Sequence, residues 1–330
     1  MTSIRDVAKL AGVSPSTVSR VMNGTAKVDE EKMQRVLNAI SETGFKPNEV
    51  ARSLFKKSSK IIGVIAPDIE NPFFTEMARA IESEAYIQGY RMTLCYSENK
   101  PEKEKESIRM LSRMNADGII LMTNNEEIDA EIKACNIPVV AVDRRTHADG
   151  EAAFVEADHY EGGKLAAEHL IQCGCRNIVN ISGPQKYSSA RDRYRGYVDI
   201  CKQYNREVRN LECEYSFRQG LLAAEEILEK YPDVDGIISC NDMVAISVYK
   251  VLRRHGCRVP QDVQIIGFDN VALSHLMTPE LTTIQQPVAD MGRTAVQCII
   301  DCVAGNKVTR ENKFPVTLVK RETTVAKTKK

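Results

Sequence analysis

The side chains of this sequence that could do chemistry are polar and aromatic groups that follow short apolar segments of the chain. They are Asn71, Phe73, Phe74, Asp143, Arg144, Asn241 and Asp269. Each of them alone could equally cap a helix or fill a core. Together they offer hydrogen-bond donors and acceptors beside flat apolar rings, and a sugar needs this mixture for its hydroxyls and its C–H faces. The sequence therefore predicts a cleft for a polar ligand.

Neither catalysis nor metal binding is favoured by the remaining candidates. Ser274 and His275 lie near Asp269, but adjacent residues cannot orient as nucleophile and base, and no serine has the G-x-S-x-G surroundings of a nucleophile elbow. Cys173 and Cys175 could form half of a metal site, but no second Cys or His pair at ligand spacing accompanies them. We therefore expect no catalytic residue, no metal and no cofactor.

The cleft residues fall in a region, from Ile61 onward, where apolar segments alternate with amphipathic helices. The predicted strands are Ile61–Ala66, Tyr90–Cys95, Gly118–Met122, Pro138–Val142, Phe154–Glu156, Asn177–Ile181, Gly236–Ser239 and Val263–Gly267. The predicted helices include Phe73–Gln88, Tyr160–Gln172, Ala190–Tyr204, Gly220–Lys230 and Met243–Arg254. This alternation is typical of an α/β body with parallel sheets and right-handed crossovers. Ligands of such sheets bind beyond the carboxyl ends of the strands, where the polar residues lie.

The first 46 residues predict three short helices that bury one another's apolar stripes. Ser3 and Asp6 have the spacing of a capping box, and Ser14 followed by Pro15 suits the start of a second helix. A third helix fits from about Asp29 to Ser41. The apolar residues at helical spacing are Ile4, Val7, Ala8, Ala11, Val18, Val21, Met22, Met33, Val36, Leu37 and Ile40.

The tight turn at Gly12–Val13 between the first two helices predicts a helix-turn-helix, whose second helix enters the DNA major groove. If Val18 faces inward, four residues of that helix face outward, and an outward arginine can donate two hydrogen bonds to guanine. The four outward residues are Pro15, Ser16, Ser19 and Arg20. Spacing alone leaves another three-helix interaction module open as an alternative, because the pattern is short.

Charge is divided unevenly along the 330 residues, although the formal net charge is zero. The first 60 residues carry 11 Lys and Arg against 6 Asp and Glu, and the remainder carries 34 against 39. A basic head on an acidic body favours a polyanion as partner of the head. The ten cysteines are scattered without a CxxC pair, as in reduced proteins. The sequence opens with MTSIRD and not with an apolar signal region, and no stretch approaches the roughly twenty apolar residues of a membrane span. We expect a cytoplasmic protein with no membrane partner.

The segment Ile4–Asn23, IRDVAKLAGVSPSTVSRVMN, resembles the head of the LacI/GalR repressors almost residue for residue. The resemblance implies base contacts from Pro15, Ser16 and Arg20. It implies phosphate contacts from Thr17, Ser19 and Asn23. The segment Pro47–Lys57 is similar to the family's hinge helix, and it carries an apolar edge flanked by positive charge. We assign to Leu54, helped by Ala51, the role of a wedge that enters the minor groove and opens a base step.

The remainder of the chain resembles the ribose-type periplasmic sugar-binding fold that the LacI/GalR family shares, with ribose operon repressors the most similar group. We therefore expect a head at 1–46, a hinge helix and linker at 47–60, and a two-lobed sugar-binding and dimerisation domain at 61–330. The resemblance implies a ligand site made of Asn71, Phe73, Phe74, Asp143, Arg144, Arg193, Phe217, Asn241, Asp269 and either Gln285 or Gln286.

The resemblance also implies a homodimer that binds palindromic operator DNA and is released by a small sugar, with ribose as the first candidate. Sucrose or another sugar, a corepressor, and a nucleobase or partner protein as effector stay open as alternatives. A free sugar-binding protein is a rival of another class, and the basic head speaks against it. The Lys-rich segment Arg321–Lys330 has no leucine heptad, so a dimer is expected and not a coiled-coil tetramer.

Replacing the predicted wedge should weaken DNA binding. We expect Leu54→Ala to lower operator affinity by about 1–3 kcal/mol, because less distortion of the duplex is rewarded by fewer contacts. Operator titrations of the parent and the variant at one salt concentration measure this difference. Equal affinities would contradict the wedge role.

Overall fold

The computed structural model describes residues 2–23, 28–45, 58–123, 126–145 and 152–326. The chain divides into two compact units, Met1–Ser59 and Lys60–Lys330, which we call the head and the body. Among the described residues, no helix is both long enough and apolar enough to cross a membrane.

The head consists of α1 (Ile4–Ala11), α2 (Pro15–Asn23) and α3 (Glu30–Thr43). The predicted capping box of α1 is confirmed: the backbone N–H of Ser3 donates to Asp6 Oδ2 at 2.8 Å, and the N–H of Asp6 donates to Ser3 Oγ at 3.4 Å. At the start of α2, Ser14 Oγ accepts the Thr17 N–H at 3.2 Å. Local capping therefore fixes where both helices of the helix-turn-helix begin.

The apolar stripe of α3 differs from the prediction. Met33 and Leu37 were expected inside, but they are 39% and 46% exposed. The buried face of α3 is instead built on Val36 and Ala39, with Ile40 packed against them. This face has the same three- and four-residue spacing, and the small side chain of Ala39 lets the helix approach the others closely.

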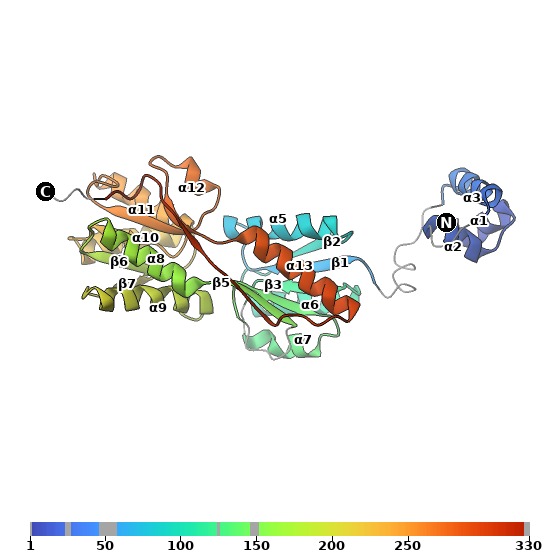
Figure 1. Ribbon diagram of the computed structural model, residues 1–330, viewed down its shortest axis with the longest axis horizontal. Helices are drawn as coiled ribbons and strands as arrows, with labels where there is room; N and C mark the ends of the chain where they lie inside the picture. Colours follow the sequence, from blue (N-terminus) through green and yellow to red (C-terminus); the bar gives the residue numbers. More distant parts are fainter. Residues whose placement is uncertain (1, 24–27, 46–57, 124–125, 146–151, 327–330) are drawn as a thin grey trace. The chain divides into compact units, whose positions relative to one another are not determined.

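The body contains two six-stranded sheets, each the centre of one lobe (Figure 1). The first sheet, in the order β11-β5-β4-β3-β1-β2, contains β1 (Ile61–Ala66), β2 (Arg91–Tyr96), β3 (Gly118–Leu121), β4 (Val139–Val142), β5 (Ala153–Ala157) and β11 (Glu311–Phe314). The second, in the order β12-β10-β9-β8-β6-β7, contains β6 (Ile178–Ser182), β7 (Arg209–Glu212), β8 (Gly236–Ile238), β9 (Gln264–Asp269), β10 (Thr282–Gln285) and β12 (Thr317–Val319). All neighbouring strands are parallel except β10 and β12.

Helices cover both sheets. The first lobe carries α5 (Pro72–Ile87), α6 (Pro101–Arg113), the short η1 (Glu126–Ile128), α7 (Asp129–Ala134) and α13 (Val288–Ala304). The second lobe carries α8 (His159–Gln172), α9 (Ser188–Gln203), α10 (Phe217–Lys230), α11 (Asp242–Arg254) and α12 (Leu273–Leu276). The predicted α/β body with parallel sheets is confirmed. The chain passes between the lobes after β5, after β10 and between β11 and β12, so the two sheets are joined by several segments.

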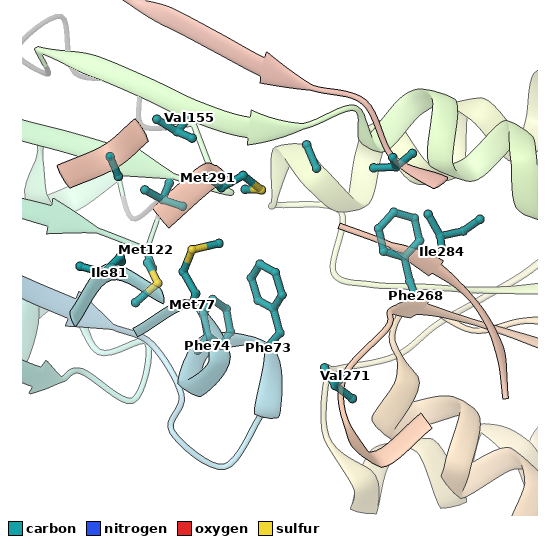
Figure 2. Close-up of a cluster of buried hydrophobic side chains, with 14 of the residues drawn as sticks. Phe73, Phe74, Met77, Ile81, Met122, Val155, Phe268, Val271, Ile284 and Met291 are labelled. Carbon is teal, nitrogen blue, oxygen red and sulfur yellow. The ribbon is translucent and has the colours of Figure 1, made fainter. Parts of the chain in front are cut away.

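A continuous apolar cluster links the lobes beneath the polar residues of the strand ends. Figure 2 shows Phe73, Phe74 and Met77 on one side of this cluster and Phe268 and Ile284 on the other. Phe73 and Phe74 come from the first turn of α5, and their rings are 5.2 Å apart in an edge-to-face arrangement. Both rings are therefore part of the core as well as close to the predicted cleft.

Helices α8 and α9 pack unusually closely because glycines lie at their crossing. A Cβ on Gly163 would overlap the backbone carbonyl oxygen of Arg193, and one on Gly196 would overlap that of Tyr160. These glycines thus set the distance at which α9 lies on α8. Since α9 carries Arg193, they also set the depth of one predicted ligand-binding side chain.

Adding one methyl group at this crossing should destabilise the body. We expect Gly163→Ala to lower the free energy of unfolding by about 1–3 kcal/mol, since α9 must move away from α8. Urea unfolding followed by circular dichroism measures the loss, and Gln172→Ala at the exposed end of α8 serves as the control, with an expected change within about 0.5 kcal/mol. A Gly163→Ala variant as stable as the parent would show that the crossing is loosely packed.

Candidate functional site

A cavity lies between the two lobes, at the carboxyl ends of their strands. Its side chains nearly fill it, and the space left between them, about 10 Å³, would hold about one water molecule. It is lined by Asn71, Phe73, Phe74, Asp143, Arg144, Ser189, Arg193, Tyr215 and Asp269.

In the first lobe, helix and strand ends place the lining residues. Asn71 caps α5, its Oδ1 accepting the Phe73 N–H at 3.1 Å, and Pro72 occupies the first helical position. Asp143 and Arg144 follow β4 directly, and Asp143 has a left-handed backbone with φ of +69°. A non-glycine residue in this region is strained, and such strain is common where a side chain must be aimed at a ligand.

The carboxylate of Asp143 belongs to a chain of polar groups that crosses from one lobe to the other. Arg193 Nε donates to His159 Nδ1 at 3.3 Å, which leaves the ring proton on Nε2, and Nε2 lies 3.3 Å from Asp143 Oδ1. Burial alone would raise the pKa of Asp143, but His159 and the guanidiniums of Arg193 and Arg144 outweigh it and lower that pKa. Asp143 is therefore held as a carboxylate, ready to accept hydrogen bonds.

The guanidinium of Arg144 is buried, at 4% exposure, inside a cage of aromatic rings. Its Cζ lies 3.9 Å from the Tyr187 ring centre, 5.2 Å from that of Phe74 and 5.7 Å from that of Tyr215. Nη1 donates to Asn99 Oδ1 at 3.3 Å. The rings hold the planar group by cation–π attraction and leave its edge for other hydrogen bonds.

In the second lobe, Arg193 and Asp269 face the same cavity. Arg193 Cζ lies 3.6 Å from the Phe268 ring centre, and its Nη1 donates to the Cys240 carbonyl at 2.7 Å. Its Nη2 is 3.8 Å from Asp269 Oδ1, which also accepts Gln286 Nε2 at 2.8 Å. Asp269 has a φ of +109°, so it repeats at the end of β9 the strain of Asp143 at the end of β4.

Burial raises the pKa of Asp269 to about 7, against the attraction of Arg193 and the hydrogen bond from Gln286. The nearby carboxylates of Asp143 and Glu76 add to the increase. The pKa values of the two acidic side chains of the cavity are thus shifted in opposite directions. Asp143 stays ionised, whereas Asp269 exchanges its proton near neutral pH.

Several buried polar atoms around the cavity have no hydrogen-bond partner among the described residues. They include Arg144 Nε, Tyr215 Oη, Asn241 Nδ2 and Gln286 Oε1. This set contains donors, an acceptor and a hydroxyl that can do both. Buried polar groups are nearly always paired in folded proteins, so the arrangement fits a ligand that carries several hydroxyl groups.

Hydrogen bonds between the lobes surround the cavity. Tyr187 Oη donates to Asn99 Oδ1 at 3.4 Å, and the Arg145 N–H donates to Ser188 Oγ at 3.1 Å. A third bond joins the Ala272 N–H to a carboxylate oxygen of Glu76 on α5 at 2.9 Å. The lobes are therefore in direct polar contact on more than one side of the site.

Four predicted ligand residues are not among those that line the cavity. Asn241 is buried at the end of β8, where its Oδ1 caps α11 by accepting the Val244 N–H at 2.9 Å. Phe217 begins α10, half-buried, with Lys250 Nζ 5.2 Å from its ring centre. Gln285 is exposed. Of the two glutamines left open by the sequence, Gln286 is the one that contacts a lining residue, Asp269.

Ser189, Tyr215 and His159 lie at the site but were not predicted from the sequence. Helix α9 begins at Ser188, two residues before its predicted start, so Ser189 was assigned to a loop. Tyr215 follows β7, whose residues Arg-Asn-Leu-Glu lack the apolar pattern by which strands were predicted. The sequence feature that could have indicated Tyr215 is an aromatic residue directly after a short polar strand.

In the head, α2 presents the face expected to contact DNA. Pro15, Ser16 and Arg20 are exposed and Thr17 and Ser19 are half-buried, while Val18 is fully buried. Asn23 is the last residue of α2, and its side chain lies outside the described part of the chain. Ala51 and Leu54, the predicted wedge, also lie outside the described residues.

Comparison with known proteins covers both units. Residues 3–48 match the family described as bacterial regulatory proteins, lacI family. Residues 59–322 match the family described as periplasmic binding proteins and sugar binding domain of the LacI family. The ribose operon repressor of Halalkalibacterium halodurans is 38% identical over 327 residues, which is 98% of this chain and 97% of that protein.

Two solved structures extend the likeness. A lac repressor dimer bound to operator and the anti-inducer ONPF is 28% identical, with a TM-score of 0.89 over 98% of this chain and 99% of the other. A LacI family regulator from Enterococcus faecium with bound ribose is 28% identical, with a TM-score of 0.73 over 81% of this chain and 100% of the other.

The two acidic side chains of the cavity should give opposite pH effects on stability. The pKa of Asp269 is raised, so between its unfolded value near 4 and about 7 the folded protein keeps a proton that the unfolded chain loses, and stability falls as pH rises. Asp269→Asn should remove this loss. As pH rises from 4 to 7, the free energy of unfolding of the variant should increase relative to that of the parent, by up to about 4 kcal/mol in the ligand-free protein.

Asp143→Asn provides the contrast for this experiment. Because the pKa of Asp143 is lowered, its carboxylate stabilises the fold above about pH 4 and loses that effect only in stronger acid. Asp143→Asn should therefore be less stable than the parent throughout pH 5–8. Urea unfolding at each pH measures both differences. A constant difference between Asp269→Asn and the parent across this range would contradict the account of Asp269.

Proposed function

Because this chain belongs to the LacI family of bacterial regulatory proteins and is a transcriptional repressor of that family, we propose that it controls a sugar-utilisation operon. In this proposal a homodimer binds a palindromic operator through the two heads. A small sugar, ribose in the first place, binds between the lobes of the body and releases the DNA.

The observation that carries the proposal is the set of polar groups that both lobes direct at one small cavity. Asp143 and Asp269 offer carboxylate oxygens, and Arg144 and Arg193 offer guanidinium donors. Phe73 and Phe74 add apolar rings against which C–H groups can pack. A monosaccharide matches this mixture of groups better than a flat purine does.

Ribose is the first candidate for two reasons. The ribose operon repressor of Halalkalibacterium halodurans is similar to this chain over nearly its whole length. The Enterococcus faecium regulator that binds ribose shares the fold of the body. Both likenesses support a pentose, and other sugars are tested in the same experiment.

Dimerisation is supported by exposed apolar side chains on the first lobe. They lie on β2, which is an edge strand of its sheet, on α5, which packs against β2, and on α6 with the residue that follows it. These side chains are Tyr86, Ile87, Leu94, Tyr96, Met110 and Met114. Apolar side chains and an unpaired strand edge together favour a protein partner, and a second copy of the chain supplies one.

The proposed mechanism is a coupling of two binding equilibria through the dimer. A sugar that bonds to Asp143 in one lobe and Asp269 in the other favours the arrangement in which the lobes are closed on it. A palindrome requires the two recognition helices about 34–36 Å apart, one turn of DNA. We propose that closure shifts the first lobes across the dimer interface, so that the heads lose this spacing and the hinge wedges leave the minor groove.

The proposal predicts a measurable loss of operator affinity. We expect saturating ribose to weaken binding of the full-length protein to a palindromic DNA selected from a random library by about 5- to 150-fold at constant salt. Fluorescence anisotropy measures it. Unchanged affinity with ribose would contradict ribose as the inducer, and tighter binding would make the sugar a corepressor. The same titration with hexoses, sucrose and purines tests the other effectors.

Substitutions of two arginines of α9 distinguish a loss of sugar binding from other effects. Arg193 lines the cavity, whereas Arg195, two residues further along α9, is exposed. Arg193→Ala should still bind operator but need at least about 100-fold more ribose for release, since it loses donors to the sugar. Arg195→Ala should respond as the parent does. Equal responses of the two variants would place the effector elsewhere.

A further inference from the structure

A hydrogen bond outside the cavity joins helix α5 of the first lobe to the start of α12 in the second lobe (Figure 1). Glu76 Oε1 on α5 accepts the backbone N–H of Ala272 at 2.9 Å. Glu76 is not among the residues that line the cavity. It lines an open groove of about 610 Å³ between α5, the start of α13 and the ends of β9 and β10. We call the Glu76–Ala272 contact the clasp.

The first-lobe end of the clasp is held rigidly by the packing of α5. Met77, the neighbour of Glu76 in the chain, is fully buried in the apolar core. A Cβ on Gly292 of α13 would overlap the side chain of Ala80, so α5 and α13 lie in close contact. Glu76 therefore moves only with the lobe that carries it.

The second-lobe end of the clasp is equally fixed, although it belongs to a loop. The Val271 N–H donates to Asp242 Oδ2 at 2.9 Å, and Arg321 Nη2 donates to Asn270 Oδ1 at 2.6 Å. These bonds tie the residues before Ala272 to the body of their own lobe. The length of the clasp thus depends on how the two lobes are placed relative to each other.

Small movements of the lobes are enough to break the clasp. A hydrogen bond between N–H and oxygen requires the two heavy atoms to lie within about 3.5 Å, and the clasp measures 2.9 Å. A separation of about 1 Å at this point removes the bond. The clasp therefore stabilises one arrangement of the lobes and not its neighbours.

The arrangement of the lobes that forms the clasp has no room for a sugar in the cavity. The lining side chains leave about 10 Å³, the space of about one water molecule. A monosaccharide therefore binds only when the lobes have moved relative to each other. If a sugar releases operator DNA, the clasped arrangement is the one that binds the operator.

We propose that the clasp stabilises the operator-binding arrangement of the body, and that a sugar must break it in order to bind. This inference rests on the proposed release of DNA by a sugar and adds to it. The apparent affinity for the sugar is the intrinsic affinity multiplied by the fraction of molecules that can bind. Glu76 thus sets the sugar concentration at which the DNA is released, although it lies outside the cavity.

The test removes each partner of the clasp separately in the full-length protein. Glu76→Ala removes the acceptor, and Ala272→Pro removes the donor N–H at a residue whose φ of −52° suits proline. Calorimetric titration with D-ribose, or with whichever pentose or hexose binds the parent, measures the sugar affinity. We expect each variant to bind the sugar about 3- to 30-fold more tightly than the parent. The double variant should bind it no more tightly than either, because the two substitutions remove the same bond.

Glu82→Ala is the matched control, since Glu82 is an exposed residue of α5 and its replacement removes the same charge. This variant should bind the sugar as the parent does. Glu76→Gln keeps an oxygen that can accept the Ala272 N–H, so its affinity should lie closer to that of the parent than the affinity of Glu76→Ala does. Thermal unfolding confirms that the variants fold. A general loss of structure weakens binding, and the expected gain therefore distinguishes the clasp from a merely structural contact.

An unchanged or lower sugar affinity of Glu76→Ala would overturn the proposal, and so would an equal gain in Glu82→Ala. Additive gains in the double variant would show that Glu76 and Ala272 act independently, which also contradicts it. These results are obtained with a parent that binds sugar, so the proposed function survives them. A parent that binds no sugar at all contradicts the proposed function itself, and the role of the clasp falls with it.

Discussion

Buried hydrogen-bonding groups need partners, and the structure of the body depends on this constraint. Many of these groups lie between the two lobes. Asp143 and Arg144 come from the first sheet, and Arg193 and Asp269 come from the second. Neither lobe alone can surround a small polar molecule with donors and acceptors. A ligand that pairs with these groups must therefore contact both lobes, and its binding energy is at the same time an energy of lobe closure.

The rest of the body holds these residues in backbone conformations that are unfavourable on their own. Asp143 and Asp269 have left-handed backbones, which cost about 1–3 kcal/mol each in non-glycine residues. Near Asp269, the buried carboxyl group of Asp242 accepts the Val271 N–H at 2.9 Å and the Thr283 hydroxyl at 2.6 Å, so it fixes the loop that follows β9. The apolar cluster beneath the cavity anchors both strand ends. Each lobe thus holds its own part of the site in place, and this order lowers the cost of binding.

Much of this arrangement could be predicted from the sequence, because buried strands are apolar and the residues after them are not. Asp143 and Asp269 were found in that way. Tyr215 was missed because β7 lies at a sheet edge and is polar, so its end was not recognised. The choice between Gln285 and Gln286 could not be made, since the side chains of successive strand residues point to opposite faces and a shift of one residue exchanges them. Met33 and Leu37 were assigned to the head core because two stripes of α3 have the same helical spacing.

The central claim is that sugar in the cleft and operator on the heads oppose each other, and thermodynamic linkage makes this claim testable from the sugar side. If the sugar weakens DNA binding, the DNA must weaken sugar binding by the same factor. The most direct measurement is therefore a calorimetric titration of ribose into the protein alone and into its complex with operator. The account predicts an affinity about 5- to 150-fold lower in the complex. The same affinity in both titrations would contradict it.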